Sequence, residues 1–150
     1  MYHTEKSSSK EQIEAEAYIF SQVKERIPAA LERNPKVPCH GETYIQPDFY
    51  SEPEKIIGEI FAHVGKPKKA QDNKIANDIL KMLLLEKLTG QEYRKIIVVC
   101  DEKELAKLQG KSALAESIRQ FGIELMYIEL DEKWRELLLQ AQERQRMVNG

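Results

Sequence analysis

The sequence has few cysteines, and this limits the covalent framework that it can form. Cys39 and Cys100 are the only two, which is too few for a disulfide-stabilised fold. Cys100 ends an apolar run, where a buried free thiol is common. Cys39 and His40 could form half of a zinc site, but no second pair of ligands follows at suitable spacing, which favours a role without metal.

Long apolar runs and glycine-rich motifs are also absent. No stretch approaches the roughly 20 apolar residues that a helix needs to cross a bilayer. The first residues, Met1–Lys6 followed by serines, do not resemble a signal peptide. We therefore expect a cytoplasmic protein without a membrane partner. No glycine-rich phosphate loop follows the strand that ends at Cys100, and no Gly-x-Ser-x-Gly is present, which argues against a Rossmann nucleotide-binding domain and a serine hydrolase.

The composition is typical of one globular domain with a substantial core. The 150 residues are 41% hydrophobic and carry a formal net charge of -2. We expect residues 1–9 to be disordered and residues 10–150 to form a single α/β domain. The near-neutral charge argues against a chain covered in phosphate-binding surface but allows a local basic patch.

Helices and strands alternate along the chain. Hydrophobic spacing and capping residues predict helices from about Lys10 onward, with an apolar stripe from Ile13 to Leu31, and from Ala70 or Gln71 to Thr89. Residues 34–42, which contain two prolines and a glycine, are expected to form a loop. The run from Lys95 to Asp101 predicts a strand buried on both faces. Short helices capped by Asp101 and Ser112, a strand over residues 123–130 and a helix after Asp131 complete the pattern.

The most informative stretch is residues 44–64, which reads as a β-hairpin. Two runs rich in aromatic and β-branched residues flank the turn Glu52–Lys55. A turn centred there pairs Ser51 with Ile56 and Tyr50 with Ile57, and places Asp48 opposite Glu59.

The same register sorts the side chains of the hairpin onto two faces. One face is a core face, formed by Ile45, Phe49, Ile56, Gly58, Ile60, Ala62 and Val64. The other is a mixed polar surface that includes Asp48 and Glu59. Directly opposed residues have β-carbons about 4.5–5.5 Å apart, so two carboxylates placed there repel each other. A divalent cation such as Mg²⁺, which binds one or two carboxylates together with water and phosphate oxygens, would relieve this repulsion.

Pro47-Asp48, a turn, and Gly58-Glu59 within an apolar strand resemble the motif of the PD-(D/E)XK nuclease superfamily. The resemblance implies a restriction-endonuclease-like fold: a helix, three antiparallel strands, a helix and a further strand. It also implies a metal site that uses Asp48 and Glu59. The family motif continues as acid-x-lysine, and here Phe61 stands in place of the lysine.

The resemblance suggests which residues could complete such a site. Some relatives supply the missing lysine from the helix that follows the second catalytic strand, so Lys74 and Lys66 are candidates, and Lys68 and Lys69 could contact phosphate. Many relatives carry an acidic metal ligand on the first helix, a position that Glu16 occupies here. Alternatively, Lys74 and Asp78 form only a surface i,i+4 ion pair, and Glu16 is only a boundary residue that extends to solvent.

Two functions follow from these observations. The first is Mg²⁺- or Mn²⁺-dependent hydrolysis of nucleic acid, with DNA the expected partner, by an enzyme that could act as a homodimer. The second is a nuclease-fold module that has lost its chemistry and serves in binding or assembly, which the replacement of the motif lysine by Phe61 favours. His63 could act as a ligand or base on the acidic face, although a histidine at a strand end is more often hydrogen-bonded to a neighbour.

Overall fold

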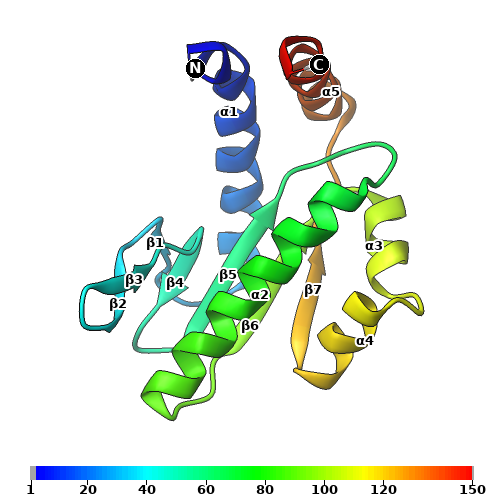
Figure 1. Cartoon of the computed structure of the whole chain (residues 1–150). Coiled ribbons are helices and arrows are strands. Elements are labelled where there is room, and N and C mark those ends of the chain that lie inside the picture. Colours follow the sequence, from blue (N-terminus) through cyan, green and yellow to red (C-terminus); the bar gives the residue numbers. More distant parts are fainter. Residues whose placement is uncertain (1–2, 150) are drawn as a thin grey trace.

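A five-stranded mixed β-sheet forms the centre of the protein, with helices on both faces (Figure 1). The computed structural model describes the backbone of residues 3–149 and the side chains of residues 10–147. Within this range α1 runs behind the sheet and α2 crosses its front, while both ends of the described chain lie at the same end of the molecule. The predicted α/β class is confirmed.

The described residues form five helices and seven strands. The helices are α1 (His3–Arg26), α2 (Lys69–Thr89), α3 (Glu102–Leu108), α4 (Ala113–Gln120) and α5 (Glu132–Asn149). The strands are β1 (Glu32–Arg33), β2 (Val37–His40), β3 (Thr43–Ile45), β4 (Phe49–Ser51), β5 (Ile56–Phe61), β6 (Arg94–Val99) and β7 (Ile123–Tyr127).

The main sheet changes from antiparallel to parallel pairing at β5. Its strand order is β1-β4-β5-β6-β7, with antiparallel pairing among β1, β4 and β5 and parallel pairing among β5, β6 and β7. Helix α2 is the crossover that returns the chain from β5 to β6, as a parallel connection requires. Strands β2 and β3 form a separate two-stranded hairpin.

Two hydrophobic cores lie on the two faces of the sheet. The first contains α1 and α5 residues such as Ile19, Val23 and Leu138, packed against Phe49 and Ile60 of the sheet. The second lies under α2, α3 and α4. It includes Tyr50, Ile57, Phe61, Ile79, Met82, Leu85, Leu108 and Ile118. All residues of β5 and nearly all of β6 are buried because both faces of these strands are covered.

The hairpin confirms the predicted register but corrects the predicted faces. Tyr50 pairs with Ile57 and Ser51 with Ile56, as expected. The face predicted to be a mixed polar surface is instead a second core, because α2 covers it and buries Ile57 and Phe61. Ile45 packs in this second core and not on the predicted core face.

Several predicted boundaries also differ from the structure. Helix α1 begins at His3 and not near Lys10; Met1 and Tyr2 lie outside the described residues. The first half of the predicted apolar stripe is wrong, since Ile13 is 61% exposed while Ala15 and Ile19 are fully buried. The predicted loop over residues 34–42 contains β2, and the last strand ends at Tyr127. No described helix has the length and hydropathy needed to cross a membrane.

The predicted helix caps at Asp101 and Ser112 are confirmed. The Asp101 side chain accepts a hydrogen bond from the Lys103 amide at 2.8 Å, and Ser112 accepts one from the Ala115 amide at 3.0 Å. Gly90 ends α2 in the left-handed conformation, with φ of 69°. Such local signals do not depend on the tertiary fold, which is why sequence alone reveals them.

Gly58 brings β5 into direct contact with a core aromatic ring. Gly58 pairs with Phe49 across the two strands. A β-carbon at Gly58 would lie 2.0 Å from Cζ of Phe49, which is fully buried. The ring therefore lies over the bare backbone of Gly58 and fixes β4 against β5 immediately beside Asp48 and Glu59.

Candidate active site

Asp48 lies just before β4, and backbone hydrogen bonds hold it in place. The Arg33 guanidinium and the Asn34 amide donate to the Asp48 carbonyl oxygen at 2.9 and 3.0 Å. Its side-chain Oδ2 accepts a hydrogen bond from the Ile60 amide at 2.7 Å. Asp48 is thus tied to β1 on one side and to β5 on the other, which leaves Oδ1 to interact with other groups.

Glu59 lies on β5 beside Asp48 and is only 8% exposed. Burial, together with the negative charges of Asp48 and Asp78, raises the pKa of Glu59 to about 9. A hydrogen bond between the Glu59 and Asp48 side chains contributes to the same shift. In the absence of a metal ion, Glu59 therefore keeps its proton near neutral pH and donates it to Asp48. The repulsion predicted from the sequence is present and is relieved by protonation.

Glu16 approaches the same acids from α1. Burial raises the pKa of Glu16, and the charge of Asp48 adds to this effect, whereas a hydrogen bond from Gln12 opposes it. Gln12 Nε2 donates to Glu16 Oε2 at 3.2 Å and to the Ala62 carbonyl oxygen at 3.1 Å. Gln12 thereby connects the carboxylate on α1 to the end of β5.

Lys74 on α2 is a positive charge that acts on these acids. Burial disfavours its charge, but Asp78, Glu59 and Asp48 outweigh that effect and raise the pKa of Lys74. Lys74 Nζ lies 3.2 Å from Asp78 Oδ2. The i,i+4 ion pair expected as an alternative is therefore formed, but it is not an ordinary surface pair, because Asp78 is only 7% exposed and acts on Glu59.

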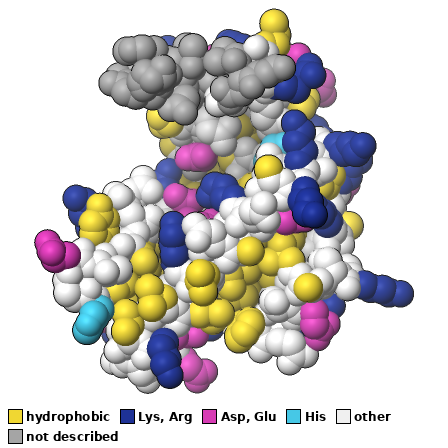
Figure 2. Space-filling view, viewed as in Figure 1, with side chains coloured by type: hydrophobic (Ala, Val, Ile, Leu, Met, Phe, Trp, Pro, Cys, Tyr) yellow, Lys and Arg dark blue, Asp and Glu magenta, His cyan; other side chains and the backbone are white. Residues whose placement is uncertain are grey.

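Glu16 and Lys74 line a cleft of about 700 Å³ between α1, the end of β5, the start of α2 and the last turns of α5, whereas Asp48 and Glu59 are not part of its lining. Its lining comprises Gln12, Glu16, Ile60, Phe61, Ala62, His63, Lys68, Ala70, Gln71, Lys74, Ala141, Gln142, Gln145 and Arg146. Figure 2 shows that charged side chains of both signs gather on the upper half of this side of the molecule, while hydrophobic side chains gather lower down over α2.

The structure separates the four lysines proposed from the sequence. Lys74 and Lys68 line the cleft. Lys66 and Lys69 are not part of its lining, although all four lysines are exposed. Lys74 is therefore the lysine that the fold brings to the acids.

The donor set fits a magnesium ion bound mainly by water and substrate. Among the side chains described for residues 10–147, no three His, Cys, Asp or Glu converge as a ready-made metal-ligand group. Mg²⁺ commonly binds one or two carboxylates and completes its shell with water and phosphate oxygens. Asp48 and Glu59 supply two adjacent carboxyl groups, one of which holds a proton that a cation would displace.

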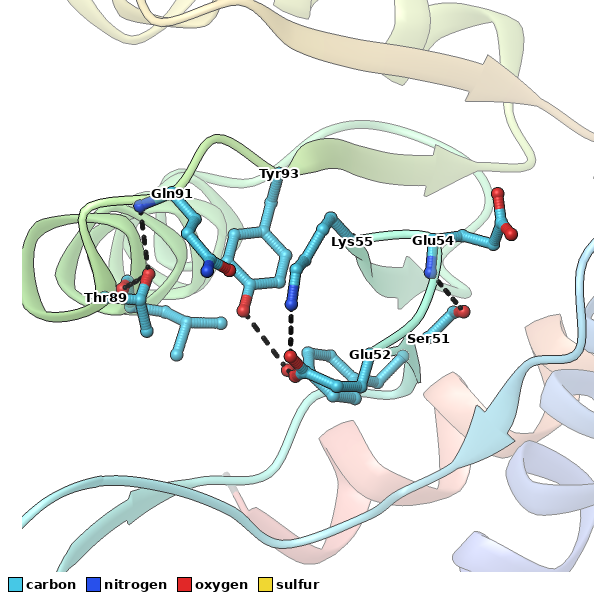
Figure 3. A network of polar contacts seen from close by, with 9 residues as sticks. Ser51, Glu52, Glu54, Lys55, Thr89, Gln91 and Tyr93 are labelled. Carbon is cyan, nitrogen blue, oxygen red and sulfur yellow. Dashed lines mark hydrogen bonds and ion pairs between the residues drawn. The ribbon is translucent and has the colours of Figure 1, made fainter.

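A second, smaller cavity of about 360 Å³ lies near the turn of the hairpin. It is lined in part by Tyr50 and Tyr93, whose hydroxyl groups are 3.3 Å apart. Figure 3 shows Lys55 pointing at Glu52, which also accepts a hydrogen bond from Tyr50. This cavity contains none of the site residues proposed from the sequence.

Sequence reasoning does not identify Gln12 and Asp78 as parts of the site. The i,i+4 spacing of Gln12 and Glu16 on one helix face is the signal that could link the first pair. The sequence shows Asp78 only as a partner of Lys74, because it does not show that α2 presses this face onto β5. Comparisons with protein-family models, with curated proteins and with solved structures found no match for this chain.

Proposed function

We propose that this protein is a metal-dependent nuclease of the PD-(D/E)XK type that hydrolyses phosphodiester bonds in DNA. The observation that carries the proposal is the grouping of Glu16, Asp48, Glu59 and Lys74, whose charges act on one another and of which Glu16 and Lys74 line one cleft. These four residues come from a helix, a loop, a strand and a second helix. A surface charge pattern without function would not require buried carboxyl groups held next to one another.

The order of elements supports the same proposal. A helix is followed by the antiparallel strands β1, β4 and β5, then by the helix α2 and the parallel strand β6. The restriction-endonuclease-like core implied by the sequence resemblance has this order. Lys74 on α2 compensates for Phe61, which occupies the position of the motif lysine and is buried in the core under α2.

The roles of the residues follow from their positions. Asp48 Oδ1 and the ionised Glu59 would hold Mg²⁺ or Mn²⁺, water and phosphate oxygens would complete the shell, and Glu16 would contribute through a bound water. The ion would supply a Lewis acid for the phosphate and lower the pKa of bound water. Lys74 orients the attacking water and stabilises the negative charge that develops on the phosphate. Lys68, on the cleft wall, contacts the substrate backbone.

Cleavage assays with purified protein test the proposal. We expect cleavage of linear DNA with Mg²⁺ or Mn²⁺ and none in EDTA. Asp48→Asn and Lys74→Met should each lower kcat by at least about 100-fold. Lys87→Met, an exposed lysine near the end of the same helix, is the matched control and should retain activity. Wild-type protein that cuts neither DNA nor RNA with either ion would contradict the proposal.

A module that has lost catalysis is the second candidate, and Phe61 at the motif position is the observation that favours it. This candidate predicts that the Asp48 and Glu59 pair stays protonated and metal-free. Calorimetric titration with Mn²⁺ separates the two candidates. Binding that disappears in Glu59→Gln supports the enzyme, whereas an absence of binding to wild-type protein supports the inactive module.

A further inference from the structure

His63 is a buried polar residue in the cleft that the proposed chemistry does not use. It is 8% exposed and lines the cleft beside Lys68. Its Nδ1 is enclosed by the protein without a hydrogen-bond partner among the described residues, whereas Nε2 is not enclosed. Nε2 is therefore the ring nitrogen that opens onto the cleft.

The enclosed Nδ1 fixes the chemical character of His63. A second proton on the ring would place an N–H group in the interior with no acceptor, which disfavours the charged imidazolium. Burial and the nearby charge of Lys68 also lower the pKa of His63, against an opposing effect of Asp101. Asp101 is already bound by the Gly65 amide, the Lys103 amide and Arg135. The imidazole is thus neutral and presents an Nε2–H donor to the cleft.

The start of α2 adds further donors to the same wall. The first N–H groups of a helix have no partners within the helix, and the aligned peptide dipoles make this end positive. Lys68 precedes α2, and no side chain caps the helix there. Donors and a positive charge converge on this wall, and an anion is the ligand that such a wall accepts.

From this arrangement we infer a phosphate-binding subsite at the start of α2, formed by His63 Nε2, Lys68 and the first N–H groups of the helix. This subsite holds the phosphate that neighbours the cleaved phosphate on the same nucleic-acid strand. The inference rests on the proposed function for the identity of the strand. The binding of a phosphate group itself can be measured without catalysis.

Nuclear magnetic resonance titration of ¹⁵N-labelled protein in EDTA tests the subsite directly. The probes are thymidine 5′-monophosphate and inorganic phosphate, with thymidine as the uncharged control. We expect the amide resonances of Lys69 and Ala70 to move with both phosphate probes and not with thymidine. His63→Phe and Lys68→Gln should each raise the Kd at least fivefold, while Lys87→Gln should change it less than twofold.

The subsite would be overturned if the phosphate probes moved amide resonances equally over the whole surface. It would also be overturned if both His63→Phe and Lys68→Gln left the Kd for these probes unchanged. Response to inorganic phosphate alone would show that the site holds free phosphate and not a nucleotide, which also contradicts the inference. Cleavage assays keep this result separate from the proposed function. If Lys68→Gln raises KM and leaves kcat within threefold, the subsite is supported during catalysis. If wild-type protein binds the nucleotide as expected but cuts nothing, the nuclease proposal fails and the phosphate site remains.

Discussion

Replacing Glu59 by glutamine should stabilise the metal-free protein at neutral and higher pH. The pKa of Glu59 is about 9 in the folded protein, compared with an ordinary value of 4.5. Between these values the unfolded chain is ionised at Glu59 while the folded protein keeps the proton. Folding then takes up a proton, so the stability of the wild type falls as the pH rises through this window. Glutamine does not titrate and removes this dependence.

The magnitude follows from the distance between the working pH and the ordinary pKa of glutamate. At pH 7.5, three pH units above 4.5, about 1.4 kcal/mol per pH unit gives about 4 kcal/mol as an upper value. The glutamine amide can donate a hydrogen bond to Asp48 in place of the carboxylic acid. We therefore expect Glu59→Gln to raise the free energy of unfolding by about 2–4 kcal/mol at pH 7.5 and by less than about 1 kcal/mol at pH 5.

Urea denaturation from pH 5 to pH 9 in EDTA measures this difference. Glu54 is an exposed glutamate in the hairpin turn, and Glu54→Gln is the control. Its free energy of unfolding should equal that of the wild type at every pH. Adding Mg²⁺ should stabilise the wild type and leave Glu59→Gln unchanged, because the ion requires the ionised carboxylate. If the free energy of unfolding changed with pH in the same way for the wild type and for Glu59→Gln, the reasoning would be refuted, because the buried proton would then have no energetic effect.

Two further predictions concern the core and the thiols. Gly58→Ala should lower the free energy of unfolding by about 1–3 kcal/mol, because its β-carbon would lie 2.0 Å from the Phe49 ring. Phe49→Leu should recover part of this loss in the double variant, and strictly additive losses in urea denaturation would contradict the contact. Burial raises the pKa of Cys100 to about 12, so a thiol reagent at pH 8 should modify Cys39 in the folded protein and Cys100 only after unfolding. Rapid native-state labelling of Cys39→Ser would show that this prediction is wrong.

The parts of the site that follow from the sequence are those that depend on neighbouring residues. The turn at Glu52–Lys55 determines which residues of β4 and β5 face each other, so the pairing of Tyr50 with Ile57 and the closeness of Asp48 to Glu59 can be worked out. Helix caps such as Asp101 are equally local. Local patterns alone therefore predict the two acids and their repulsion, whereas the candidate lysine on the next helix follows only from the family resemblance.

The remaining features depend on tertiary packing, which hydrophobic spacing does not specify. Ile57 and Phe61 share a strand face with Glu59, which suggests a mixed, partly exposed face, and only the position of α2 buries them. The choice between Lys74 and Lys66 requires the same helix to be placed against β5. Tyr44 and Ile45 suit a longer first strand, but β3 pairs with β2 and leaves the chain around Asp48 irregular.

The change from antiparallel to parallel pairing at β5 has a consequence for how the protein folds. Asp48 and Glu59 are brought together by a tight hairpin, which closes quickly because the loop is short. Lys74 arrives only when the crossover helix has docked and β6 has paired with β5. Early intermediates would thus hold two acids without their counter-charge, so alkaline conditions should slow refolding, and a cation that bridges the hairpin acids should speed it.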